Sequence, residues 1–522
     1  MKQKGILIVI MLILVAMSCK KESEMFSFYR DTDPRNLKTL KDGEFYSWAA
    51  SDSALIRADY FLNVQGEITS YGDSILAYGH CWAEAARIES PSIGRDHDTI
   101  YEIEVSPGNS VTYPSYLPNL EPDTEYNIRS FVVRKKNGII DTAYNQVVTK
   151  IATLPAIDQW FEQITDQKPT DMRFDAVAFN LGDTMFFGTG NQGNRYLKKD
   201  IQMYNPTTQK WENLFNLPTV YLPVTGQYRD KLTNGTGFAL SFFDYNQQAT
   251  LKCIYIGLGD YGGDDSRDDK SNQIIEYNLA DGSIRHMDWT GGLRSGAVSF
   301  TIGSKAYIGT GSGSVAMENW YVFDPSGPSR PIDVFPGPNP EWQSLPTIPG
   351  GGRRTGAIAF SIGGKGYFGL GKAADGTFLN DFWEFRPSED GSNDGEWSRK
   401  ADFPGAPREN ASAFVVGSQG YVGTGDNIVG DMEGSYTGEI FSDVYRYDPF
   451  NNKWIEVKGY TINDKNEATR DPKKVTRSCG FSRKTYDYGF IGFGIVPDAN
   501  PRAQEDMWKY QPWEAGEFRG NK

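Results

Sequence analysis

The residues whose type and spacing most clearly indicate a ligand site are five arginines, each at the same distance from a repeated glycine motif. A Gly-x-Gly marks each of six repeats, beginning at Gly188, Gly257, Gly309, Gly369, Gly423 and Gly492, and in five of these copies an arginine lies 15 residues before the first glycine. These arginines are Arg173, Arg294, Arg354, Arg408 and Arg477. A guanidinium group is planar, permanently charged and able to donate two parallel hydrogen bonds to a carboxylate. A ring of such groups suits an acidic ligand, such as a uronic or sialic sugar or an acidic protein loop.

A structural interpretation of the same arginines stays open beside this one. A residue that recurs in most copies of a repeat is expected to stabilise the repeat unit first, with ligand binding as a second role. On this interpretation each guanidinium bonds to neighbouring backbone carbonyl groups and ties adjacent units together. The repetition favours the structural interpretation, and the five arginines remain the candidate ligand-binding residues of the chain.

The residues between these landmarks indicate the elements that hold the arginines in place. A small residue follows each arginine by three positions, an aromatic residue follows by thirteen, and a tryptophan begins a later strand in four copies. An Asp or Asn that precedes an aromatic residue by four positions marks the third strand, at Asp200, Asn319, Asp381, Asp443 and Asp506. The second copy departs from the pattern, because Asn234 stands where the arginine is expected, 23 residues before Gly257. Each copy therefore predicts one four-stranded antiparallel sheet, with a glycine where the chain turns sharply.

This pattern resembles the kelch repeat, with Gly-x-Gly in place of that family's commoner Gly-Gly. The resemblance implies an all-β fold in which a six-bladed β-propeller covers residues 155–515. In kelch propellers the loop before the first strand and the loop after the second lie on one face, which places the five arginines around one mouth. Trp160 lies 13 residues before Arg173, close to the spacing from Trp342 to Arg354. We therefore expect the strand around Trp160 to complete the sixth blade and close the ring.

The beginning of the chain has the features of a lipoprotein signal peptide over residues 1–18. Two lysines precede an apolar run over residues 6–15 that is too short to span a bilayer as a mature helix. The sequence Ala-Met-Ser-Cys then resembles a lipobox, which implies lipidation of Cys19. We expect a lipidated tether over residues 19–41 and an anchor in the cell outer membrane, with the protein exposed at the cell surface.

Residues 42–153 show short runs of alternating apolar and polar residues, which is the pattern of half-buried strands. Within them, the segment from Leu120 to Tyr126 resembles the L-x-P-x-T-x-Y pattern of fibronectin type III domains. In that family the tyrosine hydroxyl bonds back to the upstream backbone. The resemblance implies a small β-sandwich that acts as a spacer.

Composition excludes some partners and leaves one possible site open. A net charge of −14 and a pI near 4.9 argue against nucleic acid as a partner. We expect Cys81, Cys253 and Cys479 to be buried apolar side chains. The acidic loop from Asp260 to Asp269 carries five carboxylates that could hold Ca²⁺, but its spacing matches no EF-hand, and a solvated loop is the alternative. We predict no cofactor and no metal site.

Catalysis finds little support in the sequence. The kelch fold is shared by galactose oxidase, whose copper site needs two histidines, and this propeller has one histidine, His286. Sialic acid epimerases and mutarotases also use six-bladed kelch propellers, and Glu, Asp and Arg alone can run proton transfer on a sugar. No carboxylate pair stands out, and no catalytic residue is predicted.

Three functions therefore stay open, and the sequence favours binding over catalysis. The main expectation is a surface lipoprotein that binds a carbohydrate or another acidic ligand at the propeller mouth. The alternatives are a scaffold that docks onto an outer-membrane protein complex and a sugar epimerase or mutarotase. An enzyme should place carboxylates with raised pKa at the mouth, whereas a glycan binder should place exposed aromatic side chains in one pocket.

Overall fold

The computed structural model describes most of the chain from Tyr46 to Trp513. The positions inside this span that it leaves out are 51–55, 58–61, 70–73, 94–95, 102–104, 107–108, 118–119, 137–138, 146–147, 154–155, 163–167, 194–195, 206–207, 209, 246, 263–268, 327–341, 389–393, 431–435, 461–473, 484–487, 497–501 and 505. The expected signal peptide, Cys19 and tether lie outside the described residues, so the lipid anchor and the outer-membrane location stay predictions. Among the described residues, no helix is long and apolar enough to cross a membrane.

The chain divides into two compact units, with the boundary between Ala156 and Ile157. The first unit contains two antiparallel sheets. One is built from β1 (Tyr46–Ala50), β2 (Ile56–Arg57), β3 (Leu62–Thr69) and β6 (Ser110–Leu117). The other is built from β4 (Ser74–Glu84), β5 (His97–Tyr101), β7 (Glu125–Lys136), β8 (Ile139–Tyr144) and β9 (Thr149–Ala152). Leu62 of the first sheet and Ile128 of the second are fully buried in one shared core, which makes the unit a β-sandwich.

Tyr126 forms the corner that its sequence motif predicts. Its hydroxyl oxygen accepts a hydrogen bond of 2.7 Å from the backbone N–H of Glu121, five residues upstream. The ring itself is buried in the core between the sheets. Membership of the fibronectin type III family stays a prediction, whereas the hydroxyl-to-backbone bond is confirmed.

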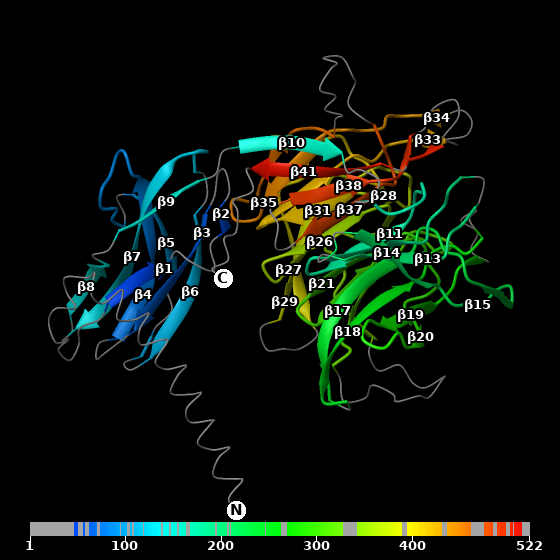
Figure 1. Cartoon of the computed structure of the whole chain (residues 1–522), viewed down its shortest axis with the longest axis horizontal. Coiled ribbons are helices and arrows are strands. Elements are labelled where there is room, and N and C mark those ends of the chain that lie inside the picture. The colour runs from blue at the N-terminus through cyan, green and yellow to red at the C-terminus, as the bar shows by residue number, and fades with distance from the viewer. Residues whose placement is uncertain are drawn as a thin grey trace, which may run out of the picture. The chain divides into compact units, whose positions relative to one another are not determined.

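The second unit contains six four-stranded antiparallel sheets within the described residues (Figure 1). The first three blades are β11 (Val177–Leu181), β12 (Thr184–Gly188), β13 (Asp200–Asn205) and β14 (Lys210–Asn216); β17 (Thr236–Asp244), β18 (Ala249–Gly257), β19 (Gln273–Asn278) and β20 (Ile284–Asp288); and β21 (Val298–Ile302), β22 (Lys305–Gly309), β23 (Trp320–Phe323) and β24 (Trp342–Ser344). The last three are β26 (Ile358–Ile362), β27 (Lys365–Gly369), β29 (Phe382–Pro387) and β30 (Gly395–Arg399); β31 (Ser412–Val416), β32 (Gln419–Gly423), β35 (Val444–Asp448) and β36 (Lys453–Val457); and β37 (Cys479–Arg483), β38 (Tyr488–Gly492), β41 (Met507–Trp513) and β10 (Ala156–Glu162).

The first strands of these sheets contact one another in a closed circle. The order of contact is β37, β11, β17, β21, β26, β31 and back to β37. A circle of inner strands, each followed outward by three more strands of its own sheet, is the arrangement of a β-propeller. The all-β fold predicted from the repeat is therefore confirmed.

The ring closes through a strand from its N-terminal end, as the spacing of Trp160 predicts. Strand β10 is hydrogen-bonded to β41, so it supplies the outer strand of the sixth blade, and Figure 1 shows the two strands side by side. Trp160 is 1% exposed, and its indole N–H donates a bond of 3.0 Å to the carbonyl of Lys458 in the neighbouring blade. The hydroxyl of Tyr510 donates to Asp158 at 2.6 Å, which joins the two ends of the unit a second time.

Aromatic side chains fill the space between neighbouring blades. Trp320 of the third blade packs on Trp397 of the fourth, with ring centroids 4.9 Å apart, and both side chains are buried. Cys253 and Cys479 are buried among such side chains, and Cys81 is buried in the first unit, as predicted. Packing of this kind makes each blade depend on both of its neighbours.

Candidate functional site

Four of the five repeat arginines lie inside the protein. Arg354 shows the arrangement: its Nη1 donates to the carbonyl of Leu370 at 3.1 Å, and its guanidinium makes a two-point contact with Asp381, with Nη2 to Oδ2 at 2.8 Å. The equivalent partners are Thr189 and Asp200 for Arg173, Thr310 and Asn319 for Arg294, and Thr424 and Asp443 for Arg408. The four arginines are 0 to 2% exposed.

These contacts favour the structural interpretation of the four arginines. Each one links the middle residue of its own Gly-x-Gly to the Asp or Asn at the start of the third strand or directly before it, so it locks one blade internally. Burial by itself raises the pKa of Asp381, but the hydrogen bonds and positive charge of Arg354 outweigh burial and hold that pKa below its usual value. A ligand carboxylate could reach these guanidinium groups only by breaking pairs that are already complete.

Arg477 lies in a different place, so the prediction of a fifth equivalent arginine is wrong. Cys479 pairs with Gly492 in the sixth blade, whereas Ile358 pairs with Gly369 in the fourth, so the sixth hairpin contains two more residues. The backbone shows which residue takes the arginine's position. The N–H of Gly371 donates to the carbonyl of Arg408, and the corresponding N–H of Gly425 donates to the carbonyl of Val475.

The second blade has the same kind of displacement. The N–H of Gly190 donates to the carbonyl of Leu232, so Leu232 and not Asn234 occupies the arginine position there. The hairpin from Thr236 to Gly257 is again longer than the common one. The two blades with lengthened hairpins are thus the two that have an apolar residue at this position.

Arg477 and Asn234 belong instead to a ring of left-handed residues around the propeller axis, which we call the axial ring. Its members follow the arginine position by two residues and have φ between 51° and 62°: Asp175, Asn234, Gly296, Gly356, Asn410 and Arg477. Backbone N–H to carbonyl bonds of 2.8 to 3.3 Å connect Asn234 to Asp175, Gly296 to Asn234, Asn410 to Gly356, Arg477 to Asn410 and Asp175 to Arg477. A left-handed arginine is uncommon, and backbone strain of this kind gathers at functional sites.

A carboxylate pair lies beside the axial ring in the fifth blade. Glu409 directly precedes Asn410, and its backbone pairs with that of Asp426 through two N–H to carbonyl bonds of 2.8 and 2.9 Å. The Glu409 side chain is 14% exposed and lies 3.6 Å from the amine of Lys372. Gly356 leaves room for it, because a Cβ there would lie 3.0 Å from Oε2 of Glu409.

Three hydrogen-bond donors fix the carboxylate of Asp426 near Glu409. Its carboxylate accepts hydrogen bonds from the side-chain amide of Asn410 at 3.2 Å, from the hydroxyl of Thr476, and from the backbone N–H of Ile428 at 3.0 Å. Its side chain is 1% exposed. Asp426 therefore acts on Glu409 as a fixed negative charge with little access to solvent.

This environment tunes the acidity of Glu409. Burial is the largest influence and the charge of Asp426 the next, and together they raise the pKa of Glu409 to about 7, against the opposite pull of Lys372 and Arg477. Asp175, 3.0 Å from Arg477, is the main cause of the raised pKa of that guanidinium, which stays charged. One carboxyl with a pKa near neutral pH thus lies beside the axial ring and two cations, and such a group can both accept and donate a proton.

Sequence reasoning missed Glu409 and Asp426, although a signal was present. Glu409 directly follows a repeat arginine, where other copies have Ser295 or Thr355, and Asp426 directly follows its Gly-x-Gly. These two positions face each other in every blade, as the pairs Ser295 with Ser312 and Thr233 with Asp260 show. Only the fifth of these copies has an acidic residue at both facing positions, and this is the signal that identifies the carboxylate pair.

The exposed aromatic pocket expected of a glycan binder is not formed by Tyr196, Trp289 and Trp320, and the described part of the acidic loop forms no metal site. Trp289 and Trp320 are 2% and 0% exposed and pack between blades, whereas Tyr196 is 58% exposed. In the loop from Asp260 to Asp269, positions 263–268 lie outside the described residues. Among the described residues, no group of three or more His, Cys, Asp or Glu is placed to hold a metal ion.

Comparisons with known proteins point toward sugar epimerases over part of the chain. No family model matches. The N-acetylneuraminate epimerase of Vibrio vulnificus (strain YJ016) is 29% identical over 174 residues, which is 33% of this chain and 41% of that protein. The N-acetylneuraminate epimerase of Shigella flexneri serotype 5b (strain 8401) is 27% identical over 184 residues, which is 28% of this chain and 45% of that protein. The solved structure described as "Structure of YjhT" aligns with a TM-score of 0.46 and 13% identity over 65% of this chain and 95% of that one. The chain thus spans less than half the length of the curated relatives that it matches, and these are named as N-acetylneuraminate epimerases.

Proposed function

We propose that this protein is a sugar epimerase of the mutarotase type, which interconverts the two anomers of a free sugar with Glu409 as its acid–base group. The observation that carries the proposal is the position of the Glu409 carboxyl beside the axial ring, 3.6 Å from Lys372 and next to the buried Asp426. The partial similarity to N-acetylneuraminate epimerases supports the same reaction class. It also makes N-acetylneuraminate the first substrate to test.

The reaction needs one group that can accept and return a proton. The Glu409 carboxylate removes the proton of the anomeric hydroxyl, and the ring C–O bond breaks as the anomeric C=O forms. The ring oxygen leaves as an alkoxide and takes the proton back from Glu409, which gives the open-chain sugar. Rotation about the bond next to the carbonyl carbon, followed by the reverse steps on its other face, gives the other anomer. A pKa near the working pH makes a carboxyl effective in both directions.

The cations beside Glu409 suit a substrate that carries its own carboxylate. Lys372 and Arg477 both act electrostatically on Glu409, from the fourth and the sixth blade. An acidic sugar that places its carboxylate between them brings its anomeric carbon to the edge of Glu409. The acidic ligand expected from the sequence is thereby kept, with Lys372 and Arg477 as its partners in place of the four buried arginines.

Anomer exchange measured by NMR tests the proposal. The wild-type protein should accelerate interconversion of the α and β forms of N-acetylneuraminate, and Glu409→Gln should lower kcat about 10²- to 10⁴-fold. Glu396→Gln, which alters an exposed glutamate on β30, is the matched control and should leave the rate unchanged. Exchange at the uncatalysed rate with the wild-type protein, or full activity of Glu409→Gln, contradicts the proposal.

The main expectation from the sequence, a surface lipoprotein that acts only as a binding module, receives no support from the relatives. Their names favour the epimerase alternative. The predicted lipid anchor and the epimerase function are compatible, because a lipid on Cys19 would attach an epimerase to a membrane as well as it would attach a binding protein. That anchor remains a prediction.

A further inference from the structure

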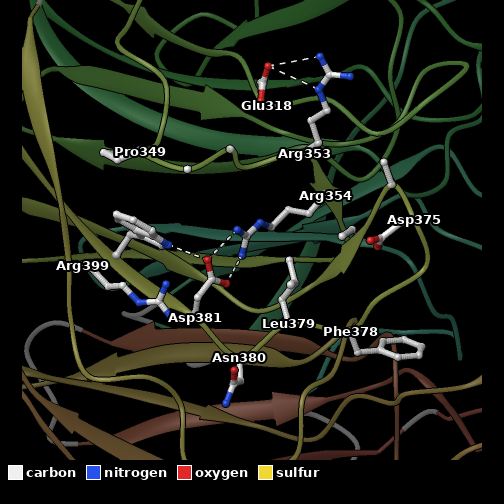
Figure 2. Close-up of a pocket in the computed structure, with 15 residues that line it drawn as sticks. Glu318, Pro349, Arg353, Arg354, Asp375, Phe378, Leu379, Asn380, Asp381 and Arg399 are labelled. Carbon is white, nitrogen blue, oxygen red and sulfur yellow. Dashed lines mark hydrogen bonds and ion pairs between the residues drawn. The ribbon is translucent and has the colours of Figure 1, made fainter.

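We propose that a cavity between the third and fourth blades holds a second sugar ring, so that the substrate is an oligosaccharide whose reducing-end sugar reaches Glu409. The inference rests on the proposed function and names the substrate class of the same site. The cavity has a volume of about 580 Å³, within the range of roughly 300 to 1,000 Å³ that is usual for small-molecule sites. Two loops form its walls, one around Pro349 to Arg354 and one from Ala373 to Asp381 (Figure 2).

The charges that line the cavity cancel. Three guanidinium groups and three carboxylates lie around it: Arg353, Arg354, Arg399, Glu318, Asp375 and Asp381. A balanced set of planar donors and acceptors fits the hydroxyl groups of a sugar, because each hydroxyl both donates and accepts hydrogen bonds.

One wall of the cavity is rigid. Asp381 is fixed by Arg354 on one side and by the indole N–H of Trp383 on the other, at 2.7 Å. Trp383 is 6% exposed, and the guanidinium of Arg399 lies 5.6 Å from the centre of its ring. Polar groups held in place before a ligand arrives lose little conformational entropy when it binds.

Two exposed arginines of the lining can adapt to a ligand. Arg353 is 60% exposed and meets Glu318 at 3.5 Å, and Arg399 is 53% exposed and pairs with Asp402. Exposed ion pairs of this kind contribute little to stability, so their groups are free to exchange partners with a sugar. In Figure 2, Arg353 and Arg354 point to different partners, although they are neighbours in the chain.

The amine of Lys372 lies between Glu409 and Phe378 of the cavity wall. Lys372, which lies 3.6 Å from Glu409, directly precedes Ala373 in the cavity wall. Its amine also lies 4.8 Å from the ring centre of Phe378, another wall residue. A sugar whose anomeric carbon lies at Glu409 can therefore extend past Lys372 and Phe378 into the cavity.

Calorimetric titration of the full chain carrying Glu409→Gln, which binds without turnover, tests this substrate class. The probes are N-acetylneuraminate and its α2,8-linked dimer, and the dimer should bind at least about tenfold more tightly. Arg353→Ala combined with Arg399→Ala should remove that advantage and leave the affinity for the single sugar unchanged. Arg386→Ala, an exposed arginine on β29 outside the cavity, should change neither affinity.

The outcomes separate this inference from the proposed function. Equal affinity for the two probes, no binding of the dimer, or a double variant that weakens both probes alike overturns the second-ring subsite. A dimer preference that depends on Arg353 and Arg399 supports the subsite, whether or not the wild-type protein accelerates anomer exchange. Anomer exchange without any dimer preference leaves the proposed function standing and removes the oligosaccharide.

Discussion

The fourth and the sixth blade carry an arginine at the same distance from Gly-x-Gly, yet the two arginines have different positions and roles. Arg354 of the fourth blade is 2% exposed and locked onto Asp381. Arg477 of the sixth blade is 35% exposed, lies in the axial ring and pairs with Asp175 of the first blade. Two extra residues in the sixth hairpin cause the difference, because they place Val475 where four of the other copies have the buried arginine.

The comparison teaches that the buried arginines of the repeat stabilise the blades. The residues that follow them by one and two positions form the candidate site. The buried arginines have almost the same partners in the four blades that carry them. The residues one and two positions later differ from blade to blade, as Glu409 and Asn410 in the fifth blade and Thr355 and Gly356 in the fourth show. Variation on a constant frame is how a symmetric fold acquires an asymmetric site.

The largest expected effect separates two adjacent arginines of the fourth blade. Arg354→Ala leaves the largely buried Asp381 without its arginine and should lower the free energy of unfolding by about 3–5 kcal/mol. Arg353→Ala removes an exposed side chain and should change it by less than about 1 kcal/mol. Urea unfolding, monitored by tryptophan fluorescence, measures the stability of both variants. Similar losses of unfolding free energy refute the distinction between a buried arginine that stabilises the blade and an exposed arginine that lines the candidate site.

A smaller effect tests the environment of Glu409 through the pH dependence of stability. The folded protein raises the pKa of Glu409 from 4.5 to about 7, so stability is fully present at low pH and declines as the pH rises through this window. Glu409→Gln removes the titrating group. The variant should therefore match the wild type at pH 4 and exceed it by up to about 3 kcal/mol at pH 8.

The control for this measurement is Glu396→Gln, which changes an exposed glutamate of the fourth blade. Its stability should follow that of the wild type across the whole pH range. A constant difference between Glu409→Gln and the wild type from pH 4 to pH 8 shows that the burial and the neighbouring Asp426 do not act on Glu409 as described.

The smallest expected effect concerns Arg477. Arg477→Gly removes the ion pair with Asp175 but relieves a left-handed conformation that costs a residue with a side chain about 1–2 kcal/mol. The two changes offset each other, so the free energy of unfolding should stay within about 1 kcal/mol of the wild type. A loss as large as that of Arg354→Ala shows instead that Arg477 is a frame residue like the other four.

The blades and their closure could be predicted from the sequence, because they are encoded in regular spacing and residue type. Trp160 closes the sixth blade, and the hydroxyl of Tyr126 bonds back to the backbone, as their spacings predict. The displacement of Arg477 could not be seen, because counting back from the glycines assumes one hairpin length. Glu409 could not be identified as acid–base group, since its pKa depends on burial and on Asp426, which is brought against it by a backbone pairing across the loop.

The pH dependence of anomer exchange tests the central claim most directly. With N-acetylneuraminate as substrate, kcat/KM of the wild type should rise with pH and level off above an inflection near pH 7, where Glu409 becomes a carboxylate. In Glu409→Gln that inflection should be absent and the residual rate should be at least about a hundredfold lower. An inflection near pH 7 that persists unchanged in Glu409→Gln contradicts the assignment of Glu409 as the acid–base group.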